Sequence, residues 1–265
     1  MAIITLLTDF GSSDGYVAAM KGVLASTAPG ASVVDASHDI PPYDVRSGAW
    51  ALRTYWRFFP AGTVHVAVVD PGVGSSRCAL LVRADGRFLL GPDNGLFSWV
   101  YQQAGRWNAF ALRSAVLRPG AMGQTFHGRD IFAYAAGLLA AGTDWRALVL
   151  GPAHKPTRFK WPGQRQRGNR LWGEVVHIDR FGNALTSIPM EALGEKTAVF
   201  IRCNNLELKR IHETYNAVPA QRPIAHPDSS GLLELSINEG NAAKSYGISI
   251  GSRVVIEFAA KVNKN

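Results

Sequence analysis

The amino-acid sequence predicts an α/β protein in two parts: a layered α/β domain with a largely parallel sheet, then a smaller domain of short strands. Strand and helix patterns alternate over the first part of the chain, as in layered α/β domains. After Gly151 the chain is basic, rich in Pro, Gly and Gln, and without periodicity, which is typical of a linker. Short strands separated by turn residues follow, as in small β-sandwiches or barrels. The predicted organisation is an N-terminal domain over residues 1–151, a basic linker over 152–170 and a C-terminal domain over 171–265.

The first domain opens with an apolar run, Ile3–Thr8, which predicts a buried strand. A helix is expected from Tyr16 to about Thr27, with Ser13 or Asp14 placed to cap it. The other elements expected in this domain are, in chain order, a strand at Val33–Asp35, a helix at Asp44–Phe59, a strand at Thr63–Val69, a hairpin of Cys78–Val82 and Phe88–Leu90, and helices at Gly95–Gln103 and Asp130–Ala141.

The second domain is predicted to be mostly β-structure, because turn residues separate its apolar runs at short intervals. The expected strands are Leu171–Ile178, Ala198–Cys203, Leu206–Ile211, Leu232–Ile237 and Arg253–Phe258. A set of this kind predicts a small sandwich or barrel.

The composition is that of a soluble globular protein with a real core, since 47% of the residues are hydrophobic and 18% are charged. The apolar start, Met1–Phe10, lacks a basic leader and is expected to be a strand rather than a signal peptide. No stretch approaches the roughly 20 apolar residues needed to cross a membrane. These features predict a cytoplasmic protein with no membrane partner.

The net charge of +8 raises the question of a nucleic-acid partner. The excess lies largely in His154–Arg170 and in the tail Lys261–Lys264, which is typical of solvated linkers and tails. No nucleic-acid partner is therefore expected. Cys78 and Cys203 match no zinc or redox motif and are interpreted as two buried thiols in a reduced compartment.

Three carboxylates stand where predicted strands end. Asp9 ends the first strand, Asp35 with Ser37–Asp39 ends the second, and Asp70 ends the third. Ligands of α/β sheets bind outside the carboxyl ends of the strands, so these side chains are candidates for a site. Each one alone has a structural alternative as a turn former or helix cap.

The loop Asp70–Arg77 is rich in glycine but lacks the Gly-Lys-Ser/Thr ending and the third glycine of nucleotide-binding loops. Its more specific content is an aspartate and an arginine on one tight loop, where the arginine keeps the carboxylate ionised and oriented. His127 follows in a glycine-containing loop, which favours a functional role. Arg129 and Asp130 are expected to hold that loop and cap the following helix.

Three further polar segments lie in the second domain. His177–Asn183 directly follows a strand, and Asp228–Gly231 and Asn238–Ala243 flank another. They are either ordinary turns or a rim of small polar groups that faces the first domain or a neighbouring subunit.

Seven short motifs together resemble one family, the S-adenosylmethionine hydroxide adenosyltransferases, relatives of the fluorinating and chlorinating adenosyl enzymes. The motifs occur in the family's order and span nearly the whole chain. They are Thr8–Gly11 with Asp14, Ser37–Ile40, Val69–Gly74 with Arg77, Pro92–Leu96, Thr125–Asp130, Ile178–Asn183 and Asn241–Ala243.

The resemblance implies an N-terminal Rossmann-like domain, a C-terminal β-barrel-like domain and a homotrimer with active sites between the N-domain of one subunit and the C-domain of the next. It implies that Asp9 binds the ribose hydroxyls and that Tyr43 covers the ribose and the sulfonium. The other substrate-binding residues that it implies are Asp14, the methionine contacts Asp179, Asn183, Ser229 and Ser230, and the adenine contacts Asn241 and Ala243. Ser187 and Tyr134 depart from the family pattern, where Asn and Pro are common.

The activity that the resemblance implies is hydrolysis of S-adenosyl-L-methionine to adenosine and methionine, with no cofactor and no metal. A sulfonium is a good leaving group, so displacement at the ribose C5′ needs a positioned, partly desolvated water. The family's water-activating residues correspond to Asp70, Arg77 and His127. Asp70 would accept a hydrogen bond or the proton, Arg77 would hold Asp70 ionised, and His127 would orient the water.

Four alternatives remain. A halogenase is disfavoured because an anionic Asp70 would repel a halide. A metal-dependent phosphoesterase on Asp9, Asp70, His127 and Asp130 would need bridging ligands and histidine pairs that the spacing does not offer. A non-catalytic S-adenosylmethionine sensor would not need the three water-activating residues together. A nicotinamide oxidoreductase lacks its glycine fingerprint.

Overall fold

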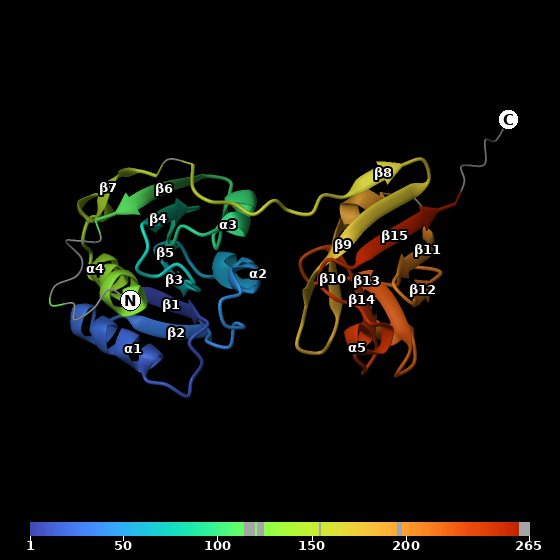
Figure 1. The fold of residues 1–265 in the computed structure, drawn as a ribbon, viewed down its shortest axis with the longest axis horizontal. Coiled ribbons are helices and arrows are strands. Elements are labelled where there is room, and N and C mark those ends of the chain that lie inside the picture. The colour runs from blue at the N-terminus through green and yellow to red at the C-terminus, as the bar shows by residue number, and fades with distance from the viewer. Residues whose placement is uncertain (114–119, 121–124, 154, 195–197, 260–265) are drawn as a thin grey trace. The chain divides into compact units, whose positions relative to one another are not determined.

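The computed structural model describes residues 1–113, 120, 125–153, 155–194 and 198–259. The chain divides into two compact units, Met1–Phe159 and Lys160–Asn265, so the second unit begins inside the segment predicted as a linker. The fold is mixed α/β with two sheets, one of them nearly barrel-shaped (Figure 1). The predicted α/β class is therefore confirmed as a mixed α/β fold with two sheets.

A seven-stranded sheet forms the centre of the first unit. Its strands, in spatial order, are β2 (Ser32–Ser37), β1 (Ile3–Thr8), β3 (Val64–Val68), β5 (Arg87–Pro92), β4 (Ala79–Ala84), β6 (Trp107–Leu112) and β7 (Val149–Pro152). The first four are parallel, and β4, β6 and β7 pair antiparallel to their neighbours. The prediction of a largely parallel sheet is therefore wrong for this second half. The reversal occurs at the hairpin turn of Asp85 and Gly86, where both residues have positive φ, as tight hairpin turns require.

Helices lie on both sides of this sheet, with α1 and α4 on one side and α2 and α3 on the other (Figure 1). The helical segments are α1 (Tyr16–Thr27), α2 (Val45–Tyr55), η1 (Trp56–Phe58), α3 (Ser98–Gln103), the π-helical turn η2 (Gly128–Ala133), α4 (Tyr134–Ala140) and η3 (Trp145–Leu148). In the described part of the chain no helix has the length and apolar character needed to cross a membrane.

The helix starts show which capping predictions hold. Asp44 caps α2, since its Oδ1 accepts a hydrogen bond from the Ser47 amide at 3.0 Å. The N-cap of α1 is Gly15, without a side-chain cap, so the prediction that Ser13 or Asp14 caps this helix is wrong. Packing of its apolar face on the sheet stabilises α1 in the absence of a side-chain cap, since Met20 and Leu24 are fully buried in the main core.

The second unit is built on a sheet that nearly closes on itself. Its strands, in spatial order, are β12 (Leu206–Leu208), β11 (Ala198–Cys203), β15 (Arg253–Phe258), β9 (Arg170–Ile178), β10 (Ala184–Pro189), β14 (Leu232–Ile237) and β13 (Pro223–Pro227), with β8 (Arg165–Arg167) paired to β9. The end strands β12 and β13 pack against each other. The remaining elements are η4 (Met190–Leu193), η5 (Tyr215–Ala217) and α5 (Ala242–Tyr246). Cys203 is buried in this unit, whereas Cys78 of the first unit is exposed, so the prediction of two buried thiols is wrong for Cys78.

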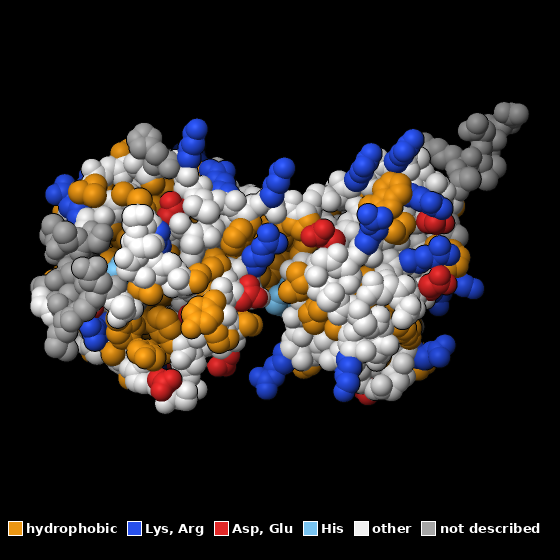
Figure 2. Space-filling view, viewed as in Figure 1, with side chains coloured by type: hydrophobic (Ala, Val, Ile, Leu, Met, Phe, Trp, Pro, Cys, Tyr) orange, Lys and Arg blue, Asp and Glu red, His pale blue; other side chains and the backbone are white. Residues whose placement is uncertain are grey.

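The basic residues of the predicted linker partly belong to this sheet. Arg165 and Arg167 are exposed in β8, and with Trp172 and Arg253 they line a surface hollow of about 310 Å³. Figure 2 shows Lys and Arg side chains standing out from the surface of this unit around β8. This placement agrees with the interpretation of these charges as solvated.

Candidate active site

The first unit brings Asp70 and Arg77, which lie on one loop, together with His127, which lies 50 residues beyond Arg77 in the sequence. Arg77 Nε donates to Asp70 Oδ1 at 2.8 Å, and Arg77 Nη2 donates to Asp70 Oδ2. The same Nη2 lies 2.8 Å from His127 Nδ1. The side chains of Asp70 and Arg77 are only 5% and 10% exposed. The guanidinium therefore joins the carboxylate and the imidazole in one shielded cluster, where charge interactions are stronger than in water.

The partners determine the protonation of His127. An arginine has only donors, so His127 Nδ1 must accept, and the ring proton then lies on Nε2. The imidazole is thus neutral and presents Nε2 as a donor. Asp70 uses one lone pair on each oxygen for Arg77, and each oxygen retains a second for another donor.

The backbone around Asp70 is held by contacts within its own loop and from the segment that follows β5. The Val73 amide donates to the Asp70 carbonyl at 3.3 Å, and the Arg77 amide donates to Ser75 Oγ at 3.3 Å. Asn94 Nδ2 donates to the Val69 carbonyl at 2.8 Å, directly before Asp70. Sequence analysis identified Pro92–Leu96 as a motif but gave no role to Asn94. The position of this amide side chain in a polar loop at a strand end is the signal that could have suggested a role in holding the neighbouring loop.

Asp9 follows β1 and contacts Tyr43. Asp9 Oδ2 accepts a hydrogen bond from the Tyr43 amide at 2.8 Å. Tyr43 has φ 68°, a left-handed conformation that a non-glycine residue adopts at a cost, and its side chain is 73% exposed. The structure therefore joins two of the residues predicted to surround the ribose. Asp14 lies exposed in the bend before α1.

Asp35 and His38, which the sequence grouped with Asp9, support the strand end. His38 Nδ1 lies 2.8 Å from Thr8 Oγ1, and His38 Nε2 lies 3.0 Å from Asp35 Oδ1. Lys21 donates to the other oxygen of Asp35 at 2.6 Å. Burial raises the pKa of Asp35, but the hydrogen bonds from Lys21 and His38 outweigh it and hold the pKa below its ordinary value. This chain of contacts fixes the residue that precedes Asp9.

An aromatic cluster links the Asp9 loop to the His127 loop. The ring of Phe10 lies 5.8 Å from that of Phe126 and 5.9 Å from that of Tyr16, measured between centroids. A Cβ on Gly128 would lie 3.2 Å from the Phe10 ring, so the absence of a side chain allows the close approach. The loops that carry Asp9 and His127 are thereby packed on each other.

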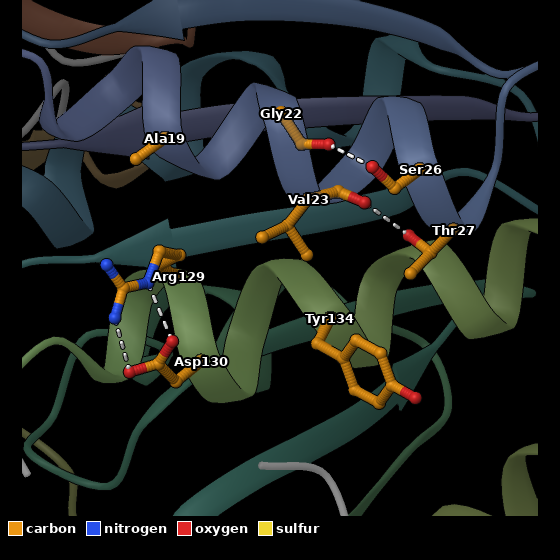
Figure 3. A pocket seen from close by; sticks show the side chains of 8 residues that line it. All are labelled: Ala19, Gly22, Val23, Ser26, Thr27, Arg129, Asp130 and Tyr134. Atoms are coloured by element: carbon orange, nitrogen blue, oxygen red, sulfur yellow. Dashed lines mark hydrogen bonds and ion pairs between the residues drawn. The ribbon is translucent and has the colours of Figure 1, made fainter. Parts of the chain in front are cut away.

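Arg129 and Asp130 lie away from the cluster. Their side chains pair with each other at 2.7 and 3.0 Å and face a groove of about 380 Å³ between α1 and η2 (Figure 3). Arg129 also lies over the Phe126 ring, at 5.0 Å from its centroid, which agrees with a role in holding the loop. Asp130 does not cap the helix, because η2 already begins at Gly128 without a side-chain cap.

In the second unit, the turn after β9 is organised by Asp179. Its Oδ1 accepts from the amides of Phe181 and Asn183 at 2.9 and 2.8 Å. Its Oδ2 accepts from Asn183 Nδ2 at 2.9 Å. The two predicted methionine contacts, Asp179 and Asn183, thus form a single acidic turn.

The same turn packs against the start of α5. The Ala243 amide donates to the Gly182 carbonyl at 2.9 Å, and a Cβ on Gly182 would lie 2.1 Å from Asn241 Cγ. Asn241 Oδ1 accepts from the Lys244 amide at 2.7 Å and caps α5. The structure therefore brings two of the predicted methionine contacts, Asp179 and Asn183, together with the predicted adenine contacts, and it gives Asn241 and Ala243 structural tasks as well.

Ser229 and Ser230 lie in an exposed turn before β14. Asp228 accepts from the Ser230 amide at 2.9 Å and from Ser230 Oγ at 2.6 Å, which is the geometry of an ordinary aspartate-stabilised turn. Among the residues that the structure describes, no group of three or more His, Cys, Asp and Glu side chains has an arrangement that could hold a metal ion.

The fold and these sites define a two-unit α/β protein with a shielded carboxylate–guanidinium–imidazole cluster at its strand ends. Residues 4–149 match the SAM hydroxide adenosyltransferase N-terminal domain, and residues 173–255 match the C-terminal domain of the same family. The chain belongs to the S-adenosylmethionine hydroxide adenosyltransferase family.

Individual relatives agree with this assignment. A (R)-S-adenosyl-L-methionine hydrolase from Thermus thermophilus is 40% identical over 263 residues, which cover 96% of this chain and 99% of the relative. A more distant relative, a fluorinase from an Actinoplanes species, is 26% identical over 97% of this chain and 98% of its own. The crystal structure of an uncharacterised conserved protein from Thermotoga maritima superimposes with a TM-score of 0.87 at 30% identity, covering 96% of this chain and 99% of that one.

Proposed function

We propose that this chain hydrolyses S-adenosyl-L-methionine to adenosine and L-methionine. The observation that carries the proposal is the Asp70–Arg77–His127 cluster, found in a chain of this family. The curated relatives at 37–40% identity over most of their length include hydrolases of this substrate.

The cluster supplies what attack by water requires. The water oxygen forms the new bond to the ribose C5′, the C5′–sulfur bond breaks, and its electron pair stays on sulfur as the methionine thioether. One proton leaves the water and passes to Asp70, which retains a lone pair on each oxygen for it. Arg77 balances the negative charge of Asp70, and His127 Nε2–H donates to the water and orients it.

The remaining site residues form the binding part of the proposal. Asp9 accepts hydrogen bonds from the ribose hydroxyls. Tyr43, whose backbone amide donates to Asp9, covers the sugar. Asp179 and Asn183 contact the methionine half. Asp14, Ser229, Ser230, Asn241 and Ala243 complete the set. We further propose that the N-terminal unit is Rossmann-like, supported by the parallel strands β2, β1 and β3, and that the protein is a cytoplasmic homotrimer with sites between subunits.

The chemistry of the cluster disfavours two of the alternatives. Asp70 would place a negative charge beside a halide nucleophile, which a halogenase must avoid. A metal-dependent phosphoesterase would need Asp70 as a metal ligand, whereas the carboxylate is already paired with the guanidinium of Arg77, whose positive charge would repel a metal cation. We propose that the reaction needs no metal and no cofactor, because the sulfonium is already a good leaving group.

The test is to incubate the purified full chain with S-adenosyl-L-methionine and a chelator and to separate the nucleosides. Adenosine and methionine in equal amounts, formed at the same rate with and without the chelator, are the expected result. Bound but unconverted substrate would contradict hydrolysis and favour a sensor. Loss of activity that added divalent metal restores would contradict the metal-free mechanism.

A further inference from the structure

A buried ion pair lies in the second unit, outside the residues assigned so far. His226 of β13 and Glu234 of β14 stand opposite each other in the strand register, with His226 Nε2 at 3.2 Å from Glu234 Oε1. Their side chains are 4% and 7% exposed. Glu234 Oε1 also accepts from Ser236 Oγ at 2.6 Å and from the Tyr215 hydroxyl. Three side chains thus converge on one carboxylate oxygen.

The surroundings favour the charged form of both partners. His226 Nδ1 lies 2.9 Å from the Pro227 carbonyl, which only accepts, so Nδ1 carries a proton, and Nε2 lies 3.2 Å from Glu234 Oε1 as an ion-pair contact outside hydrogen-bond geometry. Burial lowers the pKa of His226, but the neighbouring Glu234 carboxylate and Pro227 carbonyl outweigh it and raise the pKa. Burial raises the pKa of Glu234, but the neighbouring His226, Ser236 and Tyr215 outweigh it and lower the pKa.

The carboxylate determines the direction of every hydrogen bond on the path to the acidic turn. Tyr215 has one hydroxyl proton and gives it to Glu234, so its oxygen can only accept from Asn183 Nδ2, at 3.1 Å. Asn183 then uses one amide proton for Tyr215 and the other for Asp179. Its Oδ1 is the part of the amide left to accept, so the turn offers acceptors to a ligand.

We propose that His226, Glu234 and Tyr215 are positioning residues that fix the amide of Asn183 for the methionine half of the substrate. This inference rests on the proposed function. A buried ion pair is weak evidence for stability, because well-packed apolar residues commonly stabilise a core as well or better. The Glu234 carboxylate fixes the direction of the hydrogen bonds that run through Tyr215 to Asn183. Apolar residues in place of the pair could not fix that direction.

The partly exposed position of Tyr215 supports this role. The residue is 37% exposed, yet its hydroxyl reaches the buried carboxylate, and its ring makes an edge contact with the His226 ring, with centroids 4.2 Å apart. Removal of the hydroxyl alone therefore leaves the ring contact in place.

The test compares Tyr215→Phe with the wild-type chain and with Tyr246→Phe, a control in α5 of the same unit. We measure kcat and KM for S-adenosyl-L-methionine and the inhibition constant of adenosine, which lacks the methionine half. Loss of one hydrogen bond to a polar network predicts about a tenfold rise in KM for Tyr215→Phe, with kcat within about twofold. The inhibition constant of adenosine and all constants of Tyr246→Phe should stay unchanged.

A double-mutant cycle completes the test. In an Asn183→Ala background, Tyr215→Phe should have no further effect on KM, because its only route to the substrate has been removed. An equal loss of affinity for substrate and adenosine would overturn the inference and leave a structural role. An unchanged KM in an active Tyr215→Phe enzyme would overturn it while the proposed function stands. A wild-type chain without turnover would contradict the proposed function itself.

Discussion

The two units each hold a histidine near a carboxylate, and the surroundings of the two histidines favour different protonation states. In the first unit Arg77 stands between Asp70 and His127, and because arginine only donates, the imidazole is neutral. In the second unit the ring of His226 lies between the Glu234 carboxylate and the Pro227 carbonyl, which raise its pKa and favour the cation. The comparison teaches that the hydrogen-bonding partners, rather than the residue types, determine what each cluster can do.

The consequences for function differ accordingly. The first cluster keeps a carboxylate with unused lone pairs and a neutral imidazole, which suits it to handle a water molecule. In the second cluster two hydroxyl donors and the His226 ring converge on one oxygen of Glu234, and the pair is buried between strands, which suits it to orient its neighbours. We therefore expect substitutions in the first cluster to lower kcat and substitutions in the second to raise KM.

The largest effect is expected for Asp70→Ala. Loss of the proton acceptor should lower kcat by about 10²–10⁴-fold, while the dissociation constant of S-adenosyl-L-methionine changes by less than about threefold. Rapid-quench assays and calorimetry measure the two quantities. Asp130→Ala is the control, because its carboxylate pairs with Arg129 in the groove beside α1 and should be dispensable for turnover. Equal loss of binding and turnover would make Asp70 a binding residue.

A smaller effect is expected for Arg77→Lys. A lysine keeps the charge but cannot donate to both oxygens of Asp70 and to His127 from one planar group. We expect kcat to fall about 10–100-fold with KM little changed. Arg146→Lys, in an exposed pair with Asp144, is the control and should be neutral. A fully active Arg77→Lys enzyme would show that charge alone is required.

Sequence patterns predicted most of the elements of the first unit, including the strand that leads to Asp70. That strand was expected at Thr63–Val69 and is β3 (Val64–Val68), and the bounds of β1 and α1 are those expected from Ile3–Thr8 and Tyr16–Thr27. The three residues Asp70, Arg77 and His127 came from motif resemblance, and the structure brings them together. The direction of their hydrogen bonds, and hence the neutral tautomer of His127, needed coordinates.

The second cluster was missed entirely. Strands β10 and β13 were not predicted, because both end in proline and β10 carries the polar pair Thr186 and Ser187, which the fold buries. His226 and Glu234 become neighbours only through strand pairing, which a local pattern does not report. A usable signal existed: Glu234 lies within Leu232–Ile237, a strand that is buried throughout, where an unpaired charge would be costly.

The link between Asn183 and Asn241 can be tested at Gly182. In Gly182→Ala the new methyl group would overlap Asn241, and φ is 88°, so we expect a loss of about 1–3 kcal/mol of unfolding free energy and a weaker affinity for substrate. Gly168→Ala is a matched control in the same unit, since φ there is 60° and nothing lies within 4 Å of the added carbon. Denaturant unfolding and KM measure the difference. Equal effects in both variants would show that backbone strain alone accounts for the loss.

The smallest effect concerns the pH dependence of stability, compared between the wild-type chain and His226→Gln. The folded-state pKa of His226 lies above its ordinary 6.5, so its contribution is fully present below pH 6.5 and is lost as pH rises through the folded-state pKa. The charged and titratable groups that face it are Glu234, Asp228 and Tyr215. Glu234 has a lowered pKa, so its own contribution is lost only as pH falls through that value.

Thermal unfolding from pH 5.5 to 8.5 should therefore show the largest advantage of the wild-type chain at the acidic end and a shrinking advantage above it. His212→Gln, in the same unit, is the matched control for the loss of a histidine side chain away from the ion pair. A constant difference between the wild-type chain and His226→Gln would mean that the histidine does not change its charge over this range. A difference that grows with pH would mean that the ring is neutral in the fold, and the contrast between the two histidines would then be lost.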